Sequence, residues 1–236
     1  DNTADLAAVT GQFNPHLVDI NDAMLVHCCV RADWRALQLA AREAGFDLQA
    51  VSAFRSFSRQ LDIWNAKARG ERDVLDACAA PVNLAGLDPS QRLWAILRWS
   101  ALPGASRHHW GTDLDVIDRA AVGCDFRVQL IDDEVYGDGP FVALHDWLDS
   151  LIEQNRAYGF YRPYHQVQGR GEMPTGVAPE RWHLSHRPTS VRFEACLQCD
   201  TFREALREFY RGLAGLELRD AVLQNFNEIY SHFIRL

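Results

Sequence analysis

The sequence predicts an α+β fold, in which helices flank a small antiparallel sheet and further helices extend the chain at its C-terminus. Three observations predict this class. Apolar residues recur at helical spacing in several segments, short alternating or β-branched segments lie between them, and strands and helices do not alternate regularly. The chain has 236 residues, 47% of them hydrophobic, which is enough to bury a substantial core.

The first part of the chain is predicted to contain two helices and one strand. Gly11, Pro15 and Asn21 interrupt the N-terminal segment, so we expect no regular element there. Periodic apolar positions followed by a glycine predict each helix, and an apolar run with few charges predicts the strand. The expected segments are irregular chain over 1–29, a helix over 30–45, a strand over 46–54, a helix over 58–68 and a loop over 70–88.

The second part of the chain is predicted to mix helices with short strands and to end in helices. The expected segments are a helix over 89–102, a strand over 112–117, a helix over 141–155, a strand over 181–184 and two helices within 201–233. We therefore expect a domain over residues 1–188, followed by a helical extension over 189–236 that packs on it.

The charge balance excludes some classes of partner. The formal net charge is −8, and the acidic residues are scattered along the chain. A surface that binds nucleic acid needs clustered Lys and Arg, so we expect no nucleic-acid role. No segment approaches the roughly 18 to 20 uninterrupted apolar residues of a membrane helix, so no membrane span is predicted. The oligomeric state stays open.

The N-terminus and the cysteines bear on the compartment. Residues 1–5 show no basic region followed by an apolar run, so no signal peptide is visible. The cysteines are too few for a disulfide scaffold: Cys28, Cys29, Cys78, Cys124, Cys196 and Cys199. The last two form a lone Cys-x-x-Cys, which we interpret as ordinary thiols, with a disulfide or redox pair as the alternative. These features favour the cytoplasm, whereas removal of a leader would imply the periplasm or cell envelope.

Side chains that can bind a metal are concentrated in two segments. Residues 106–115 contain two adjacent histidines and two aspartates, and residues 180–183 add a glutamate and a histidine. Imidazole and carboxylate suit Zn²⁺, and a catalytic zinc has three protein ligands and one open position. Together the segments supply such a ligand set and a spare carboxylate that can act as a base. Taken singly, composition favours a solvent-exposed polar turn for the first segment, and the Glu–His spacing of the second occurs by chance in many chains.

Three segments resemble motifs of the zinc D-alanyl-D-alanine carboxypeptidases (VanY-like). Residues 106–115 (SRHHWGTDLD) are similar to the family's S-x-H-x-x-G-x-A-x-D motif, and residues 180–183 (ERWH) match its E-x-W-H motif. Residues 52–60 (SAFRSFSRQ) resemble its S-G-Y-R-S-x-x-x-Q segment. The motifs follow in the expected order within about residues 46–188, and the tail beyond residue 190 is not covered.

The resemblance implies a role for each matched residue. It implies that one Zn²⁺ ion, carried by the small sheet, is held by His108, Asp115 and His183, with Glu180 as the general base. Arg55 is expected to grip the substrate's terminal carboxylate or to polarise the scissile carbonyl, because a guanidinium offers a bidentate fork. The alternative for Arg55 is a surface ion pair.

Gln60 and Ser106 are implied to position the substrate, although a helix-surface role for Gln60 remains open. For Trp182 we expect core packing. His186 stays unassigned, and the Ser-x-His register favours His108 over His109 as the ligand.

One position departs from the family pattern. Asp113 occupies the place of the family's small alanine. Asp113 and Asp115 should point to the same side of a strand, because side chains alternate with a period of two. Asp113 is therefore a candidate competitor for the metal, an acceptor for a ligand histidine, or a substrate-binding group.

The resemblance implies hydrolysis of a peptide bond next to a D-amino acid in a peptidoglycan-derived peptide. A D-Ala-D-Ala carboxypeptidase is the first reading, with an L-Ala–D-Glu endopeptidase or a D-Ala-D-Ala dipeptidase as alternatives, because loops set specificity on a shared ligand set. A metal-stabilised binding module without catalysis is the alternative of another class. The presence of Glu180 argues against it.

Overall fold

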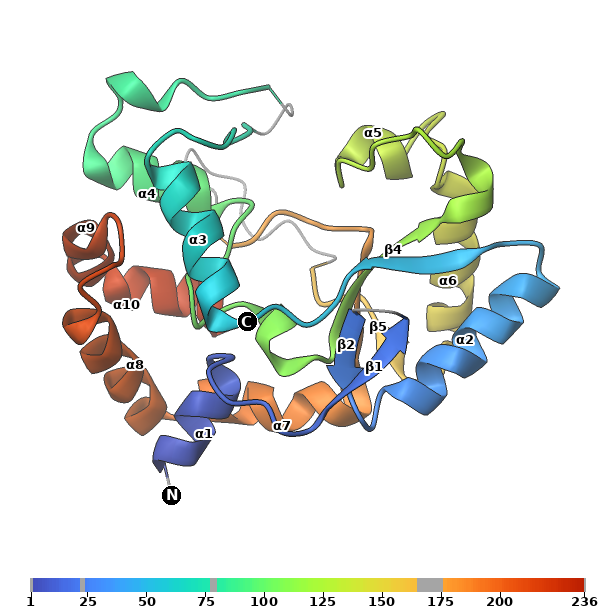
Figure 1. Ribbon diagram of the computed structural model, residues 1–236, viewed down its shortest axis with the longest axis horizontal. Helices are drawn as coiled ribbons and strands as arrows, with labels where there is room; N and C mark the ends of the chain where they lie inside the picture. Colours follow the sequence, from blue (N-terminus) through green and yellow to red (C-terminus); the bar gives the residue numbers. More distant parts are fainter. Residues whose placement is uncertain (1, 22–23, 77–79, 165–175, 236) are drawn as a thin grey trace.

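The computed structural model describes residues 2–21, 24–76, 80–164 and 176–235, and it confirms the α+β class (Figure 1). A four-stranded antiparallel sheet has the order β3–β4–β6–β5, and β1 and β2 form a separate antiparallel hairpin. The strands are β1 Leu17–Asn21, β2 Met24–His27, β3 Leu48–Ser52, β4 Asp113–Asp118, β5 Phe160–Tyr161 and β6 His183–His186.

Helices surround the sheet and form the C-terminal part of the chain. The α-helices are α1 Asn2–Val9, α2 Arg31–Glu43, α3 Phe57–Ala68, α4 Pro89–Leu97, α5 Asp132–Val135, α6 Val142–Glu153, α7 Arg187–Leu197, α8 Asp200–Gly212, α9 Arg219–Gln224 and α10 Phe226–Ile229. The short turns are η1 Leu84–Gly86, η2 Arg107–Trp110, η3 Arg119–Ala121 and the π-helical η4 Tyr230–Ile234. No helix among the described residues is both long and apolar enough to cross a bilayer.

Alternation along the central strand gives the sheet one apolar and one polar face. Leu114 and Val116 of β4 belong to a core cluster that also contains Trp34 of α2 and Leu148 of α6. These two helices lie together beside the sheet in Figure 1. Side chains of a strand point alternately to opposite faces, so the aspartates of β4 face away from this core. The fold therefore leaves one face of β4 for polar side chains.

A second core cluster joins the C-terminal helices to earlier elements. It contains Trp64 of α3, Ile96 of α4, Leu206 of α8 and Phe226 of α10, among others. The indole Nε1 of Trp64 also donates to the carbonyl oxygen of Glu217 at 3.0 Å. The C-terminal helices thus share a core with α3 and α4. The predicted division after residue 188 falls inside the first turn of α7.

Several predicted elements need correction. The N-terminal segment is not irregular, because it forms α1 and the β1–β2 hairpin, which bury Val9 and Val26 against partners far along the chain. The last predicted helix is divided into α9, α10 and η4, and α4 ends at Leu97. The strand expected over 181–184 begins later, at His183. Cys78 lies outside the described residues.

Candidate metal and catalytic site

Strand pairing places two of the predicted metal ligands opposite each other. Asp115 of β4 pairs with His183 of β6, and Asp113 pairs with Ser185. Directly opposite residues have Cβ atoms roughly 4.5 to 5.5 Å apart and share one face of the sheet. On the other side of β4, Ser52 of β3 pairs with Asp115. The sheet register therefore brings three separate motif segments to one place.

The third predicted ligand, His108, lies in η2 directly before β4. Its Nδ1 lies 2.8 Å from the carbonyl oxygen of Ala53, to which it can only donate, so its Nε2 carries the lone pair when the ring is neutral. Gly111 ends this turn with φ of +69°, and an added Cβ would lie 2.8 Å from the backbone nitrogen of His27. A glycine is needed here for both reasons.

The three side chains converge and are buried. Nε2 of His108 lies 3.3 Å from Oδ2 of Asp115, and Nδ1 of His183 lies 3.1 Å from Oδ1 of Asp115. One ligand atom from each residue lies within 4.8 Å of the other two. Nδ1 of His183 and Oδ1 of Asp115 are buried, and neither makes a hydrogen bond within the described part of the chain. A cation between them would satisfy both atoms, so the donor set fits a metal ion.

Asp113 contacts His183 at Nε2, the ring nitrogen that does not face Asp115. Its Oδ1 lies 2.9 Å from Nε2 of His183, which orients the ring so that Nδ1 faces Asp115. Asp113 also accepts from the hydroxyl of Thr112 and from Nε of Arg107, the latter at 2.8 Å. Its side chain is 0% exposed. The buried carboxylate is closed to a substrate, and its role as the acceptor for a ligand histidine stays a prediction.

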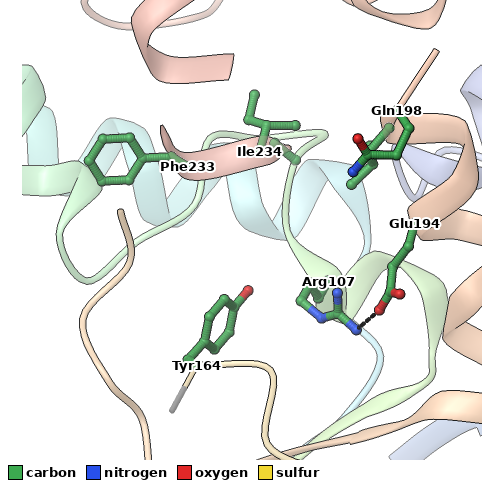
Figure 2. A pocket seen from close by; sticks show the side chains of 8 residues that line it. Arg107, Tyr164, Glu194, Gln198, Phe233 and Ile234 are labelled. Carbon is green, nitrogen blue, oxygen red and sulfur yellow. Dashed lines mark hydrogen bonds and ion pairs between the residues drawn. The ribbon is translucent and has the colours of Figure 1, made fainter. Parts of the chain in front are cut away.

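Arg107 links this carboxylate to the C-terminal helices. Its guanidinium donates to Oγ of Ser185 at 2.7 Å, to the hydroxyl of Tyr161 at 2.9 Å and to Oε1 of Glu194 at 2.8 Å. Figure 2 shows the pair with Glu194, which reaches in from α7. Burial by itself lowers the pKa of Arg107, but Asp113, with smaller contributions from Tyr164, Tyr161 and Glu194, outweighs it and raises the pKa above its ordinary value. The side chain therefore stays cationic and neutralises Asp113.

Glu180 is the most exposed carboxylate of the group. Its Oε2 lies 3.4 Å from Nδ1 of His183, and its side chain is 15% exposed, against 5% for Asp115. The backbone nitrogen of His183 donates to the carbonyl oxygen of Glu180 at 3.1 Å, which forms the turn that directs the carboxylate toward the ligands. Burial acts to lower the pKa of His183, but Asp113, Asp115 and Glu180 raise it well above its ordinary value.

Arg55 lies between the end of β3 and the start of α3. Its guanidinium donates to Oε1 of Gln60 at 2.9 Å and to Oγ of Ser52 at 3.1 Å. Burial lowers the pKa of Arg55, while Asp115 and Glu180 oppose that shift, so both carboxylates lie near enough to act on the guanidinium. Arg55 is thus a half-buried cation beside the ligands and not an isolated surface ion pair.

Gln60 has a different position from the one expected. It is 1% exposed, accepts from Arg55 and donates to the carbonyl oxygen of Ala101 at 2.7 Å. It therefore braces Arg55, and its side chain is too buried to present the amide to a substrate. Ser106 is 4% exposed and directly precedes η2, and its substrate role stays a prediction.

The other motif residues take structural places. Trp182 is buried in a small apolar cluster, as expected. His109 is turned away from the ligands, because Nδ1 lies 2.6 Å from the carbonyl oxygen of Arg55 and Nε2 accepts from the amide of Gly104. His186 lies 3.0 Å from Asp33, so it too has a partner outside the site.

Three nearby residues were missed by sequence reasoning. Besides Arg107, the ring of Tyr164 packs edge-on against His183 at 5.0 Å, and burial raises the pKa of Tyr164 well above 10. Lys67 donates to Oγ of Ser100 at 2.6 Å, and burial lowers its pKa to about 8 although Glu180 opposes the shift. Lys67 follows Gln60 by seven residues on the same face of α3, and helical spacing is the one signal that links it to the site.

A surface hollow borders the site. It has a volume of about 510 Å³, and Tyr164, Pro179 and Arg181 contribute to its wall on either side of Glu180. Arg181 is held there by Asp146 and Asp149 through ion pairs of 2.5 Å and 2.7 Å. The segment that carries Glu180 is therefore anchored next to an open space.

Two solved structures of VanY proteins have a similar fold. VanYB, solved in complex with D-alanine-D-alanine, has a TM-score of 0.51 at 18% identity, with 86% of this chain and 91% of that chain covered. A D,D-pentapeptidase VanY mutant from a VanB-type cassette, solved with Zn(II), has a TM-score of 0.50 at 20% identity, with 89% and 91% covered. At sequence identities of 18% and 20%, this likeness establishes the fold alone.

Sequence relatives extend the comparison. Two uncharacterised proteins of Haemophilus influenzae are similar to this chain. One is 43% identical over 99 residues, which are 40% of this chain and 67% of the relative, and the other is 28% identical over 134 residues, which are 56% and 92%. The sequence profile of the VanY family, described as D-alanyl-D-alanine carboxypeptidase, matches residues 24–189, well over half of the chain. The chain therefore belongs to the VanY family of peptidases.

Proposed function

We propose that this protein is a zinc-dependent carboxypeptidase that cleaves peptide bonds next to D-amino acids in peptidoglycan-derived peptides. The observation that carries the proposal is the convergence of His108, Asp115 and His183 beside the carboxylate of Glu180. Membership of the VanY family supports the same reaction, and VanYB binds D-alanine-D-alanine in its solved structure.

The proposed ion is zinc, held by His108, Asp115 and His183. Two imidazoles and one carboxylate match the donor types of catalytic zinc sites, which keep one position open. When bound, zinc acts as a Lewis acid and lowers the pKa of water from 15.7 to about 7. The related VanY pentapeptidase was solved with Zn(II), which supports this choice.

The protein's own groups divide the remaining work. Glu180 takes the proton of the attacking water and returns it to the departing amine, because it is the most exposed carboxylate beside the ligands. Arg55, held by Gln60 and Ser52, binds the terminal carboxylate of the peptide or stabilises the developing oxyanion. A guanidinium fixed by two hydrogen bonds loses little freedom when it takes up the substrate.

The proposal is tested with synthetic stem peptides that end in D-Ala-D-Ala, with a free or an amidated C-terminus. Mass spectrometry of the products should show release of one D-Ala from the free peptide by the zinc-loaded protein, loss of this activity after chelation, and its return with Zn²⁺. Equal cleavage of the amidated peptide would indicate an endopeptidase, and hydrolysis of free D-Ala-D-Ala would indicate a dipeptidase. If none of the peptides is hydrolysed, the result would indicate a metal-stabilised binding module without catalysis.

A further inference from the structure

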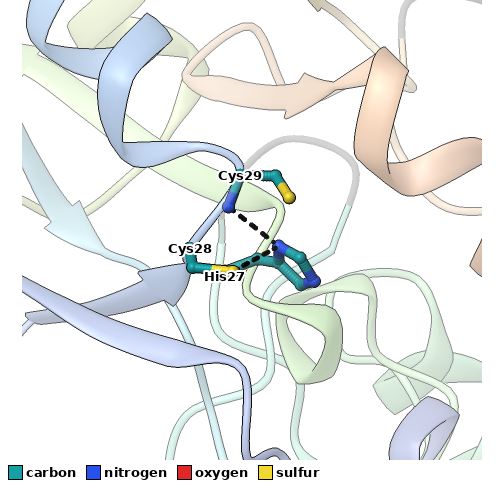
Figure 3. Close-up of side chains that lie close together, drawn as sticks. All are labelled: His27, Cys28 and Cys29. Atoms are coloured by element: carbon teal, nitrogen blue, oxygen red, sulfur yellow. Dashed lines mark hydrogen bonds between the residues drawn. The ribbon is translucent and has the colours of Figure 1, made fainter.

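A second group of metal-capable side chains lies at the end of β2. His27, the last residue of β2, is followed by Cys28 and Cys29 in the turn that leads to α2, and Figure 3 shows the three side chains together. His27 is 2% exposed, whereas both cysteines are exposed free thiols. One ligand atom of each residue lies within 4.8 Å of the other two.

The distance between the thiol of Cys28 and the imidazole of His27 suits a bound cation. Sγ of Cys28 lies 3.9 Å from Nδ1 of His27. Typical bonds of about 2.3 Å to sulfur and about 2.1 Å to nitrogen allow one zinc-sized ion to join atoms up to about 4.4 Å apart. The amide of Cys29 donates to the same Nδ1 at 3.1 Å, which keeps the ring turned toward the two thiols. A bound ion would replace that amide as the partner of Nδ1.

The backbone holds the imidazole in place. The amide of His27 donates to the carbonyl oxygen of Gly111 at 2.8 Å, and its own carbonyl accepts from the amide of Val30 at 2.8 Å. The ring also packs against that of His16 in a tilted arrangement, with ring centroids 4.2 Å apart. A ligand fixed on this rigid strand end leaves only the two cysteine side chains to be ordered when an ion binds.

A positive charge lies beside the group. Nδ1 of His27 accepts from the amide of Cys29, so this nitrogen carries the lone pair that an ion would use. The guanidinium of Arg192 contacts Nε2 of His27 and so lies beside the group. Two thiolates and a monovalent ion carry a net charge of −1, which this cation offsets, whereas a divalent ion leaves the set neutral.

We propose that His27, Cys28 and Cys29 form a second cation site, which binds a thiophilic ion, Cu⁺ or Zn²⁺. Sulfur ligands select soft or borderline ions, and both ions accept two thiolates and an imidazole. The two thiol protons leave as the ion binds. The site shares no ligand with the group of His108, Asp115 and His183, and the inference does not depend on the proposed peptidase activity.

Cobalt and copper separate this site from the buried one. Co²⁺ replaces Zn²⁺ and gives a near-ultraviolet charge-transfer band only with sulfur ligands, which the buried group lacks. The reduced full-length protein should show this band, or should take Cu⁺ from a coloured chelator, at one equivalent per chain. The double variant Cys28→Ser/Cys29→Ser, at two exposed positions, should lose the cobalt band and the Cu⁺ uptake. The variant His27→Gln should bind the ion at least tenfold more weakly.

The matched control removes two other thiols. The variant Cys196→Ser/Cys199→Ser should keep the cobalt or copper response, and circular dichroism should show that all variants are folded. A protein that gives neither response, or a response that survives in Cys28→Ser/Cys29→Ser, would overturn the proposal. Peptide hydrolysis, assayed in parallel, should be the same in both double variants, so a failure of the peptidase proposal is seen separately.

Discussion

The two metal-capable groups are built in opposite ways. His108, Asp115 and His183 come from η2, β4 and β6, and all three are buried. His27, Cys28 and Cys29 are consecutive residues at a turn, and two of them are exposed. The first group uses nitrogen and oxygen, and the second uses sulfur with one nitrogen, so the two should select different ions.

This difference shows where orientation comes from. In the buried group, His108 is held by the backbone carbonyl of Ala53 and His183 by the side chain of Asp113, so buried partners set the direction of each ring before an ion binds. In the turn, the backbone amide of Cys29 performs this task for His27, and the two thiols are exposed. Pre-orientation by buried partners suits catalysis, whereas an exposed thiol pair is open to an ion from solvent.

The largest expected effect separates the two groups. His183→Ala should release zinc from the buried group and reduce peptide hydrolysis to background, because it removes one of three ligands. The cobalt–sulfur charge-transfer band of the group formed by His27, Cys28 and Cys29 should persist. Metal analysis and absorbance on the same sample measure both. Zinc retained by the variant with full activity would break the assignment of the buried ligands.

The next effect concerns the base. Glu180→Gln should lower turnover by roughly 10²- to 10⁴-fold, the range for loss of a general base, while zinc stays bound. Turnover and metal content are measured together. Glu153→Gln, an exposed glutamate at the end of α6, is the control and should match the parent. Equal activity in both variants would contradict the role of Glu180.

A smaller effect is expected for Asp113 and Glu194, which support the predicted ligand His183. Asp113→Asn should weaken zinc binding at the buried group by roughly 10- to 100-fold, the usual cost of losing the partner of a ligand histidine. It should leave ion binding by His27, Cys28 and Cys29 unchanged. Glu194→Gln should weaken it less, because Glu194 acts through Arg107. Competition with a zinc chelator measures both affinities. Asp146→Asn, at an exposed partner of Arg181, is the control.

The smallest effect is a pH dependence of stability. Burial lowers the pKa of His109 to about 3, below its ordinary 6.5, so between these values the unfolded chain binds the proton and the folded chain does not. The free energy of unfolding of the metal-free protein should therefore fall as the pH drops from about 6.5 toward 3. His109→Gln should make this slope shallower in denaturant titrations. Parallel slopes in both proteins would show that His109 does not contribute.

The sequence alone determined much of this protein. Apolar spacing predicted α2, α3 and α6, because one face of each helix must be buried. Alternation placed Asp113 and Asp115 on one side of a strand, and both contact His183. The resemblance of three short segments identified His108, Asp115 and His183, which the fold brings together.

Only the tertiary structure decided which partners surround those residues. Arg107 and Glu194 are 87 residues apart, and no local pattern joins them, yet together they support Asp113. Gln60 occupies a motif position but braces Arg55, because α3 packs it against Ala101. The N-terminal helix and hairpin were likewise invisible, since their buried faces meet segments distant in sequence. Local spacing encodes which face of an element is apolar, whereas the identity of a contact depends on how remote segments pack.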